Sequence, residues 1–398
     1  MCYNIRGSPM KASRDKPNSA GRGIPGILIL CLLLAGCGHT GRDFRVHPYL
    51  LLTSPDELVL KFELEEDLPL SINRAPVEIY PAGRLHEISL GPQDCSRDLA
   101  VKVERVSAGK RTTLFRQTAA ARGCRPEDEL SFGVISDTHG SRRSFARVEE
   151  FFSGRFAGQS PQWLLHLGDI VKQGCREERW LRLLGRESLA RWPLVVAIGN
   201  HEYRGSPEDV RPAAVPTYFD RYLRWPGSPE AGYLSYDFPQ LKLLVLNSNF
   251  FRLDRGQRER QLEWLEEELR QAEADGQPVV AAWHHAVLTS NRWKASSREI
   301  DFIEDRIVPR LEKYNVRLVL AGHTHIYERS YRNGIHYVNA GFWGYRGPPV
   351  VGNSNPYRRF AYSLRSTLVL VRVDRERIRV EAYNRRRELI DQLEVALP

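Results

Sequence analysis

The sequence predicts an α/β (α+β) domain over residues 129–398, preceded by a small all-β sandwich over residues 47–128. From Leu130 onward, apolar runs of strand length alternate with segments of helical periodicity, which is typical of a sheet with crossover helices. Before Leu130, short strand-like runs are separated by turns rich in Pro, Gly, Asn and Asp, which is typical of a β-sandwich. A chain of 398 residues is long enough for both parts.

The N-terminus has the pattern of an export signal. A basic stretch leads into the apolar run 24–34, which is too short to span a bilayer comfortably. This run ends in Leu34-Ala35-Gly36-Cys37, which resembles a bacterial lipobox. The resemblance implies removal of residues 1–36, lipidation of Cys37 and a linker over 37–46. The body would then be exported and lipid-anchored at the cell envelope, on the outer membrane or the periplasmic face. An ordinary secretory signal with an incidental Cys37 is the alternative.

Three cysteines lie in the body of the chain, namely Cys95, Cys124 and Cys175. In an oxidising compartment a Cys95–Cys124 disulfide is plausible, because both residues lie in the N-terminal part. Cys175 is then left over. We expect it to be a buried structural thiol, because free cysteine usually behaves as a small hydrophobic residue.

The elements of the second part follow in a regular order. We expect strands at 130–136, 163–167, 193–198, 278–283 and 316–320, and helices at 144–152, 177–189, 257–274 and 297–314. A Pro-rich, aromatic insertion at about 203–232 is a candidate wall or lid over a site. An antiparallel pair at 233–237 and 241–246 follows the insertion, and two or three further strands close the chain.

Polar groups with metal-ligand chemistry follow five of these strands. Side chains at the carboxyl ends of adjacent strands converge at one edge of a sheet, so we expect them to lie close together. Two carboxylates, one amide and several imidazoles form a suitable donor set for a dinuclear metal centre that hydrolyses phosphoesters. The groups are Asp137 and His139, Asp169, Asn200 and His201, His284 and His285, and His323 and His325.

Asp169 is the candidate bridge between two divalent or trivalent ions such as Fe, Mn or Zn, because a shared carboxylate offsets their mutual repulsion. We expect one metal to be completed by Asp137, His139 and His325, and the other by Asn200, His284 and His323. The metals would hold a bridging hydroxide in line with phosphorus. Asn200 supplies an oxygen without charge, which limits the negative charge in a site that must accept a phosphate.

The order Asp-x-His, Gly-Asp, Gly-Asn-His-Glu, His and Gly-His-x-His resembles the calcineurin-like metallophosphoesterase superfamily, over about residues 130–345. The run from Gly322 to Ser330, the Gln261–Glu267 segment and the β-sandwich are similar to those of purple acid phosphatases. The resemblance implies two mixed sheets sandwiched together, with flanking helices. Two departures stand out, because Lys172 replaces the tyrosine of purple acid phosphatases and His139 is present where they lack histidine.

The resemblance also implies roles around the metals. His201 is the candidate for contacting phosphate and protonating the leaving oxygen, so the catalytic set is His201, Asp169 and Asn200. His284 is favoured over His285 as the ligand, which leaves His285 outside the coordination sphere, where such residues orient ligands. Glu202 and Arg329 are expected to be structural partners behind the site.

The formal net charge of +9 suits anionic substrates or a lipid headgroup surface, but no basic stripe is visible along the chain, so we expect no nucleic-acid partner. No obligate protein partner is evident. The predicted function is hydrolysis of small phosphomonoesters at the envelope. One alternative is a phosphodiesterase acting on a cyclic nucleotide, a glycerophosphodiester or nucleic acid. Another is a non-catalytic envelope binding module, although a structural metal site would not keep open coordination positions.

Overall fold

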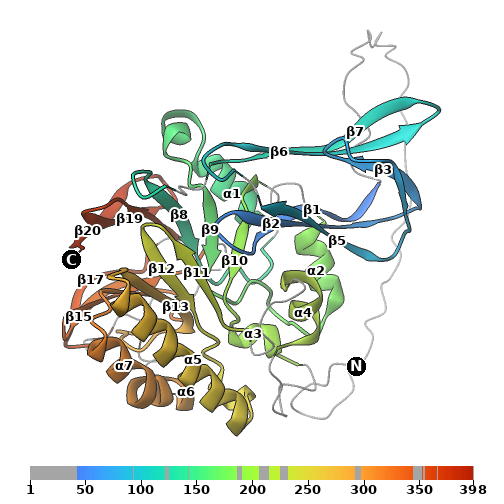
Figure 1. The fold of residues 1–398 in the computed structure, drawn as a ribbon. Coiled ribbons are helices and arrows are strands. Elements are labelled where there is room, and N and C mark those ends of the chain that lie inside the picture. Colours follow the sequence, from blue (N-terminus) through green and yellow to red (C-terminus); the bar gives the residue numbers. More distant parts are fainter. Residues whose placement is uncertain are drawn as a thin grey trace, which may run out of the picture.

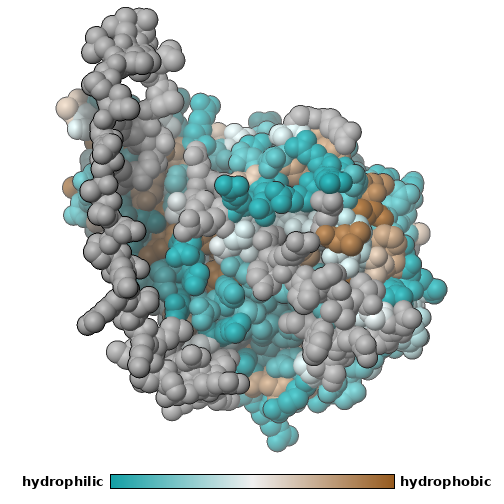
Figure 2. All heavy atoms as spheres, turned by 180° about the vertical axis from the view of Figure 1, so that it is seen from behind, coloured by the Kyte–Doolittle hydropathy of each residue, from teal (hydrophilic) through white to brown (hydrophobic). Residues whose placement is uncertain are grey.

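The computed structural model describes residues 43–397, with gaps at 93, 122–124, 142, 186–190, 206–214, 225–231, 292–296, 344–351, 353–354 and 365. Two large mixed sheets lie against each other and carry helices on their outer faces, as Figure 1 shows. The expected fold class is confirmed. Seen from behind in Figure 2, the described surface is mostly hydrophilic, with apolar atoms in small patches.

The first sheet has nine strands, and four adjacent strands in its centre run parallel. These four are β8, β9, β10 and β1, so the carboxyl ends of β8, β9 and β10 face one edge. In spatial order the sheet contains β20 (Leu389–Ala396), β19 (Arg377–Asn384), β18 (Thr367–Val373), β8 (Leu130–Ile135), β9 (Trp163–His166), β10 (Leu194–Val196), β1 (Phe44–Leu52), β2 (Glu57–Leu64) and β5 (Leu85–Pro92).

The second sheet has seven strands, and its central strands β12, β13, β14 and β16 are parallel. Val134 and Leu165 of the first sheet share one buried cluster with Val280 and Leu320 of the second, so the main core lies between the sheets. In spatial order the strands are β11 (Leu234–Phe238), β12 (Leu241–Val245), β13 (Val279–His285), β14 (Leu318–Gly322), β16 (Ile335–Ala340), β15 (Tyr327–Arg332) and β17 (Arg358–Tyr362).

Helices cover the outer face of each sheet. The first group packs on β8, β9 and β10 through residues such as Val148 and Trp180 and contains α1 (Ser144–Phe151), α2 (Glu177–Leu184), α3 (Asn200–Tyr203) and α4 (Thr217–Leu223). The second contains α5 (Arg255–Ala274), α6 (Arg298–Phe302) and α7 (Val308–Lys313), with a π-helical turn at Ile303–Ile307 between the last two. Short 3₁₀ turns lie at Gly154–Gln159 and Phe250–Arg252.

The N-terminal part is all-β, as expected, but its strands enter two different sheets. β1, β2 and β5 extend the nine-stranded sheet, with Leu51 of β1 beside Leu194 of β10. Almost every residue of β1 is buried, as befits an interior strand that is covered on both faces. The others form a separate four-stranded sheet, with the order β4 (Glu78–Tyr80), β3 (Leu68–Ile72), β6 (Leu99–Ser107) and β7 (Lys110–Ala119). The domain boundary at 128/129 stays a prediction.

Cys175 is disulfide-bonded, so the expectation of an unpaired thiol was wrong. Its side chain is only partly buried, whereas the argument for a small hydrophobic residue assumed full burial. Cys95 is also disulfide-bonded, and its expected partner Cys124 lies outside the described residues, as does Cys37. Among the described residues no helix is long and apolar enough to cross a bilayer. Much of the expected wall or lid at 203–232 also falls outside them.

Lys61 of β2 ties the N-terminal strands to α4. Its side chain is fully buried, and its Nζ donates to the carbonyl oxygens of Arg221 (3.0 Å) and Arg224 (2.6 Å) at the end of α4. Nζ also lies 2.9 Å from Oε1 of Glu87. Burial lowers the pKa of Lys61, and the ion pair with Glu87 opposes that shift. The end of α4 therefore depends on a charge supplied by another part of the chain.

Lys61→Met should lower the free energy of unfolding by about 2–4 kcal/mol, because two carbonyls and one carboxylate lose their donor. The change is measured as a shift in the urea midpoint. Lys313→Met is the matched control, since the Lys313 side chain is 61% exposed and its ion pair with Glu266 lies at the surface. Equal midpoints for the two variants would contradict this role for Lys61.

Candidate metal centre

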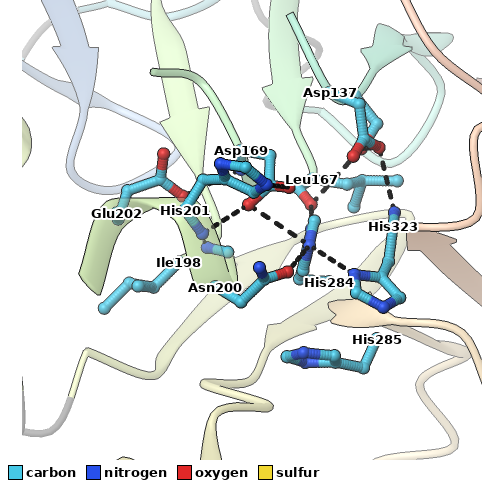
Figure 3. A network of polar contacts seen from close by, with 12 residues as sticks. Asp137, Leu167, Asp169, Ile198, Asn200, His201, Glu202, His284, His285 and His323 are labelled. Atoms are coloured by element: carbon cyan, nitrogen blue, oxygen red, sulfur yellow. Dashed lines mark hydrogen bonds and ion pairs between the residues drawn. The ribbon is translucent and has the colours of Figure 1, made fainter. Parts of the chain in front are cut away.

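The predicted ligands lie together where the carboxyl ends of strands from both sheets meet. β8, β9 and β10 are followed by Asp137 and His139, by Asp169, and by Asn200, respectively. β13 ends at His284-His285, and β14 is followed by His323 and His325. Figure 3 shows side chains from both sheets converging on His284. The positions of these residues therefore support the expectation that polar groups at the carboxyl ends of adjacent strands converge at one edge of a sheet.

Five of these residues have a backbone that L-amino acids seldom adopt. The φ angles are 52° at Asp137, 49° at His139, 56° at Asp169, 68° at His323 and 58° at His325. Each such conformation costs roughly 1–3 kcal/mol and persists only where surrounding contacts fix it. Such contacts are present, since the amide of His139 donates to the carbonyl of Asp169 (2.9 Å). The left-handed turns aim consecutive ligands inward and are typical of a functional site.

One group of donors consists of Asp137, His139 and His325. Nε2 of His325 lies 3.1 Å from Oδ1 of Asp137 and 3.3 Å from Nε2 of His139. The other carboxylate oxygen, Oδ2 of Asp137, accepts from the Ser136 hydroxyl (2.6 Å) and from the His323 amide (2.9 Å). These two bonds fix the carboxylate and leave Oδ1 directed at the imidazoles.

The second group consists of Asp169, Asn200, His284 and His323. Nδ1 of His284 donates to the carbonyl of Leu167 (2.7 Å), so Nε2 is the nitrogen that faces the other donors. Nε2 lies 3.1 Å from Oδ1 of Asn200, 3.1 Å from Nδ1 of His323 and 3.4 Å from Oδ1 of Asp169. Without a metal a proton on Nε2 is shared with these acceptors, and a metal ion would take the place of that proton. The donor set therefore fits a metal ion.

Asp169 belongs to both sides of the site. Its carboxylate lies within 4.8 Å of ligand nitrogens of His139 and His201, and also within 4.8 Å of those of His284 and His323. The amide of His201 donates to Oδ1 (2.8 Å), which orients the carboxylate. Asp169 is thus the residue that these two donor groups share.

The electrostatics of the site favour positive charge. Burial opposes ionisation of Asp137, but neighbouring histidines, His325 first, outweigh it and lower its pKa to about 2. Burial likewise works against protonation of His284, yet Asp169 and Asp137 raise the pKa of His284 to about 9. His139 differs, because burial lowers its pKa to about 4 and keeps its lone pair available at neutral pH. The two carboxylates therefore create a strongly negative potential among buried imidazoles, which attracts cations.

His201 lies at the mouth of the site. Its Nδ1 donates to the carbonyl of Lys172 (2.7 Å), and its Nε2 lies 3.8 Å from Oδ2 of Asp169. The side chain is 14% exposed, whereas those of Asp169 and His284 are at most 1% exposed. An incoming anion would therefore meet His201 before it reached the buried donors. This position agrees with the predicted role at the leaving oxygen.

Glu202 lies behind the ligands, as expected. Its carboxylate is fully buried and accepts from the amides of Asp169 (2.8 Å), Val171 (3.2 Å) and Gly199 (2.8 Å). Burial, followed by the charge of Asp169, raises the pKa of Glu202 to about 8. One side chain therefore holds the loop after β9 against the loop after β10, so the positions of Asp169 and Asn200 are coupled.

His285 lies outside the network that joins the donors (Figure 3). Ser248 Oγ accepts from the amides of His284 (3.3 Å) and His285 (3.1 Å), so its hydroxyl donates to Nδ1 of His285 (2.9 Å). The His285 ring packs against His323, with centroids 4.6 Å apart. This geometry favours His284 as a ligand and gives His285 the task of orienting His323.

Arg329 was expected behind the site, but its contacts lead elsewhere. Its Nε and Nη2 donate to the two oxygens of Asp391 in β20 (2.7 and 2.9 Å), and the hydroxyl of Tyr327 donates to the same carboxylate (2.9 Å). Arg329 therefore joins β15 to the edge strand of the other sheet. This contact stabilises the packing of the two sheets instead of orienting a ligand.

Ser136, Ser248 and Gly174 also support the site, and none of them was predicted from the sequence. Ser248 carried a signal that was not used, since Asn247-Ser248-Asn249 follows the strand at 241–246 just as the recognised groups follow theirs. Asn249 donates from Nδ2 to the carbonyl of Ile198 (2.9 Å), so this segment also supports the end of β10. Ser136 and Gly174 carry no comparable signal, because their roles depend on contacts with distant segments.

His284→Ala should lose bound metal and lower turnover about a thousandfold, because it removes a donor from the crowded group. His285→Ala should keep its metal and lose about tenfold in turnover, because only an orienting contact is removed. Metal content per chain is measured beside turnover. If His285→Ala lost its metal and His284→Ala kept it, His285 would be the ligand and His284 the orienting residue.

Comparisons with known proteins agree with this geometry. Residues 130–327 match the calcineurin-like phosphoesterase family. A phosphoenolpyruvate phosphatase of Allium cepa is 28% identical over 219 residues, covering 52% of this chain and 43% of the relative. Purple acid phosphatase 15 of Arabidopsis thaliana is 29% identical over 141 residues, covering 35% and 26%. The chain thus spans less than half the length of these relatives.

Two solved structures share the fold. The structure of PhoD superposes with a TM-score of 0.63 at 12% identity, covering 91% of this chain and 94% of PhoD. GAP50, described as the anchor in the inner membrane complex of Plasmodium, gives 0.52 at 15% identity, covering 68% and 89%. The PhoD match covers nearly the whole chain, so it extends beyond residues 130–327. The segment 130–327, which carries nearly every strand end of the site, places this chain in the calcineurin-like phosphoesterase family.

Proposed function

We propose that this protein is a metal-dependent phosphoester hydrolase with a dinuclear centre. The observation that carries the proposal is the pair of donor groups that share Asp169, one with His139 and the other with His284 and His323. A single structural site would need only one such group and would be closed to solvent. Here one rim of the site is formed by His201 and His325, whose side chains are each 14% exposed.

The residues of the chain have distinct tasks in this proposal. Asp137, His139 and His325 would hold one cation, Asn200, His284 and His323 would hold the other, and Asp169 would be shared. Two such cations, Fe, Mn or Zn, supply Lewis acidity that activates water and offsets the charge of the phosphate. Asn200 binds through a neutral oxygen, so the site keeps a net attraction for anions. His201 would contact the substrate through Nε2, because its Nδ1–H already donates a hydrogen bond to the carbonyl of Lys172.

Proton delivery to the leaving oxygen is assigned to His201. Its Nε2 faces the group formed with His139 and Asp169, and it is the accessible imidazole on that side. Asp169 holds the His201 amide by a 2.8 Å hydrogen bond, so the ring is positioned by the same carboxylate that is shared by the cations. A small phosphomonoester is the proposed substrate, supported by the printed names of the phosphatase relatives.

We also propose that the protein works at the cell envelope, held by a lipid on Cys37. The support comes from the sequence, through the apolar run that ends in Leu34-Ala35-Gly36-Cys37. An exported chain is also compatible with disulfides at Cys95 and Cys175, since disulfides persist in oxidising compartments.

The proposal is tested by the chain that begins at Gly38, stripped with a chelator and reloaded with Mn, Fe or Zn. Turnover of a chromogenic phosphomonoester and its matching diester is measured beside the number of metal ions per chain. We expect two ions, metal-dependent turnover and a preference for the monoester. A preference for the diester would assign a phosphodiesterase. A folded, fully loaded chain without turnover on either would favour the non-catalytic module.

A further inference from the structure

The four-stranded sheet has two chemically different faces. Leu70, Val103 and Phe115 point into the main core. On the other face Lys102 lies directly opposite Arg116, and Arg74 lines the same hollow. A second hollow, which also contains Arg116, is lined by Arg191. The solvent face of this sheet, from Arg74 across Lys102 and Arg116 to Arg191, is called the basic face below.

The acidic groups near the basic face do not cancel its charge. Glu104 lies on it but is bound by Lys102 (2.6 Å) and by Arg111 (3.5 Å). Glu149 pairs with Arg191 (3.4 Å). Among the described residues, Arg74 and Arg116 have no acidic partner and both are exposed. The face therefore keeps an excess of positive charge that ordinary surface ion pairs would have removed.

Apolar side chains border these cations. Ile79 is 75% exposed and Val77 is 45% exposed, in and beside the edge strand β4. Ile79 lies opposite Pro69, and Ser71, two residues further along β3, lies opposite Glu104. Because alternate residues of a strand share a face, Ile79 belongs to the same face as Lys102 and Arg116. Cations beside an exposed branched aliphatic residue are the composition of a surface that rests on lipid headgroups.

The basic face points away from the metal centre. Pro161 and Trp192 line its second hollow, and they precede β9 and β10. The ligands Asp169 and Asn200 follow the opposite ends of these same strands. Figure 1 accordingly shows β6 and β7 at the top and α3, which begins at Asn200, well below them. A surface in contact with the basic face would therefore leave the metal centre open to the aqueous side.

The predicted lipid would lie within reach of this sheet. Five residues lie between Cys37 and Asp43, so the two are at most about 20 Å apart along an extended chain. Oδ1 of Asp43 lies 3.4 Å from Nη1 of Arg105 in β6. A tether that enters here holds the sheet near the bilayer and raises the effective concentration of the basic face at the lipid surface.

We propose that the basic face docks on a membrane surface rich in anionic headgroups and turns the metal centre toward soluble substrates. The orientation rests on the proposed lipid anchor and hydrolase function, while the docking itself needs neither. An anionic bilayer is favoured over a nucleic acid because Val77 and Ile79 add apolar contact that a phosphate backbone does not use. The phosphates of headgroups and the cations of the sheet supply the attraction.

The test uses the unlipidated chain from Gly38, which keeps every described residue. Cosedimentation is measured with vesicles of phosphatidylcholine alone and with vesicles that also contain about 30% phosphatidylglycerol. We expect salt-sensitive binding to the anionic vesicles only. The double variant Arg74→Glu/Arg116→Glu should bind at least about twentyfold more weakly, from about fivefold for each charge removed. Ile79→Ser should bind severalfold more weakly at unchanged salt sensitivity.

The matched control is Arg375→Glu/Arg386→Glu, which makes the same charge change in turns beside β19, at the opposite edge of the nine-stranded sheet. It should retain most of the parent's binding. If both double variants lost binding equally, net charge alone would explain the binding and the proposal would be overturned. The proposal would also be overturned if the parent chain did not bind anionic vesicles. If the parent bound duplex DNA but no vesicles, and Arg74→Glu/Arg116→Glu lost the DNA binding, the ligand of the basic face would be nucleic acid instead of a membrane.

Turnover of a soluble phosphomonoester separates the two proposals. All these variants leave the metal centre intact, so turnover should equal that of the parent. If the parent bound vesicles but had no turnover, the proposed hydrolase function would be overturned and the proposed docking face would stand. Turnover without vesicle binding would do the reverse.

Discussion

Asp169→Asn should lower phosphomonoester turnover about a thousandfold and reduce the number of bound metal ions. The amide keeps an oxygen for the His201 amide, which donates to Oδ1 at 2.8 Å, so the fold should persist. It removes the charge shared by the two donor groups. Charge stabilisation by such ions contributes several kcal/mol, and each 1.36 kcal/mol is a factor of about ten in rate. Turnover, metal content and the thermal unfolding midpoint are measured together.

Asp391→Asn is the matched control for this prediction. Asp391 is also a buried carboxylate, with a side chain 8% exposed, but it binds Arg329 between the two sheets. Its loss should lower the unfolding midpoint and leave metal content unchanged. If Asp169→Asn kept two bound ions and more than a tenth of the parent's turnover, the proposed role of Asp169 as the shared ligand would be contradicted.

Gly174→Ala should destabilise the protein by about 3 kcal/mol or more and release metal as well. A Cβ at Gly174 would lie 1.6 Å from the carbonyl oxygen and 2.4 Å from the carbonyl carbon of Glu202. Both atoms are backbone, so no side chain can turn aside. The Gly174 amide donates to the carbonyl of His201 (2.9 Å), which places the loop after β9 flat against α3. An added methyl group must force this loop away from Asn200 and His201.

Urea unfolding and metal content test this prediction together. Gly158→Ala is the control, because a Cβ there meets nothing within 4 Å. It should unfold like the parent and keep its metal. If Gly174→Ala matched Gly158→Ala in both measurements, the close packing of the loop on α3 would not be essential to the site.

The location of the site could be predicted from the sequence because its signal is local. Each ligand follows an apolar run, as Asp137 follows 130–136 and His323 follows 316–320, and the ends of such runs converge in a sheet of this class. The separation of His284 from His285 rests on which ring meets Asn200 and which meets Ser248, and neither contact is visible in the order of residues.

Other features depend on pairings between distant segments. Nothing in the run 44–52 indicates that β1 lies beside β10, so the N-terminal strands were expected in a sandwich of their own. The disulfide at Cys175 is equally nonlocal. The basic face was missed because Lys102 and Arg116 lie on different strands and Arg74 lies in the turn after β3, so they leave no stripe along the chain.

The order of strands in the large sheet constrains how this chain reaches its native state. β8 lies between β9 and β18, with Val134 beside both Leu165 and Val369, so the catalytic sheet includes a strand from near the C-terminus. Contacts so distant in sequence slow folding, because the intervening chain must be closed into a loop before they form. During synthesis β8 cannot pair with β18 until the chain has been extended past Val373. The predicted ligands that follow β8 and β9 therefore reach their final positions late, so we expect the donor groups to be complete only after β18 has paired with β8.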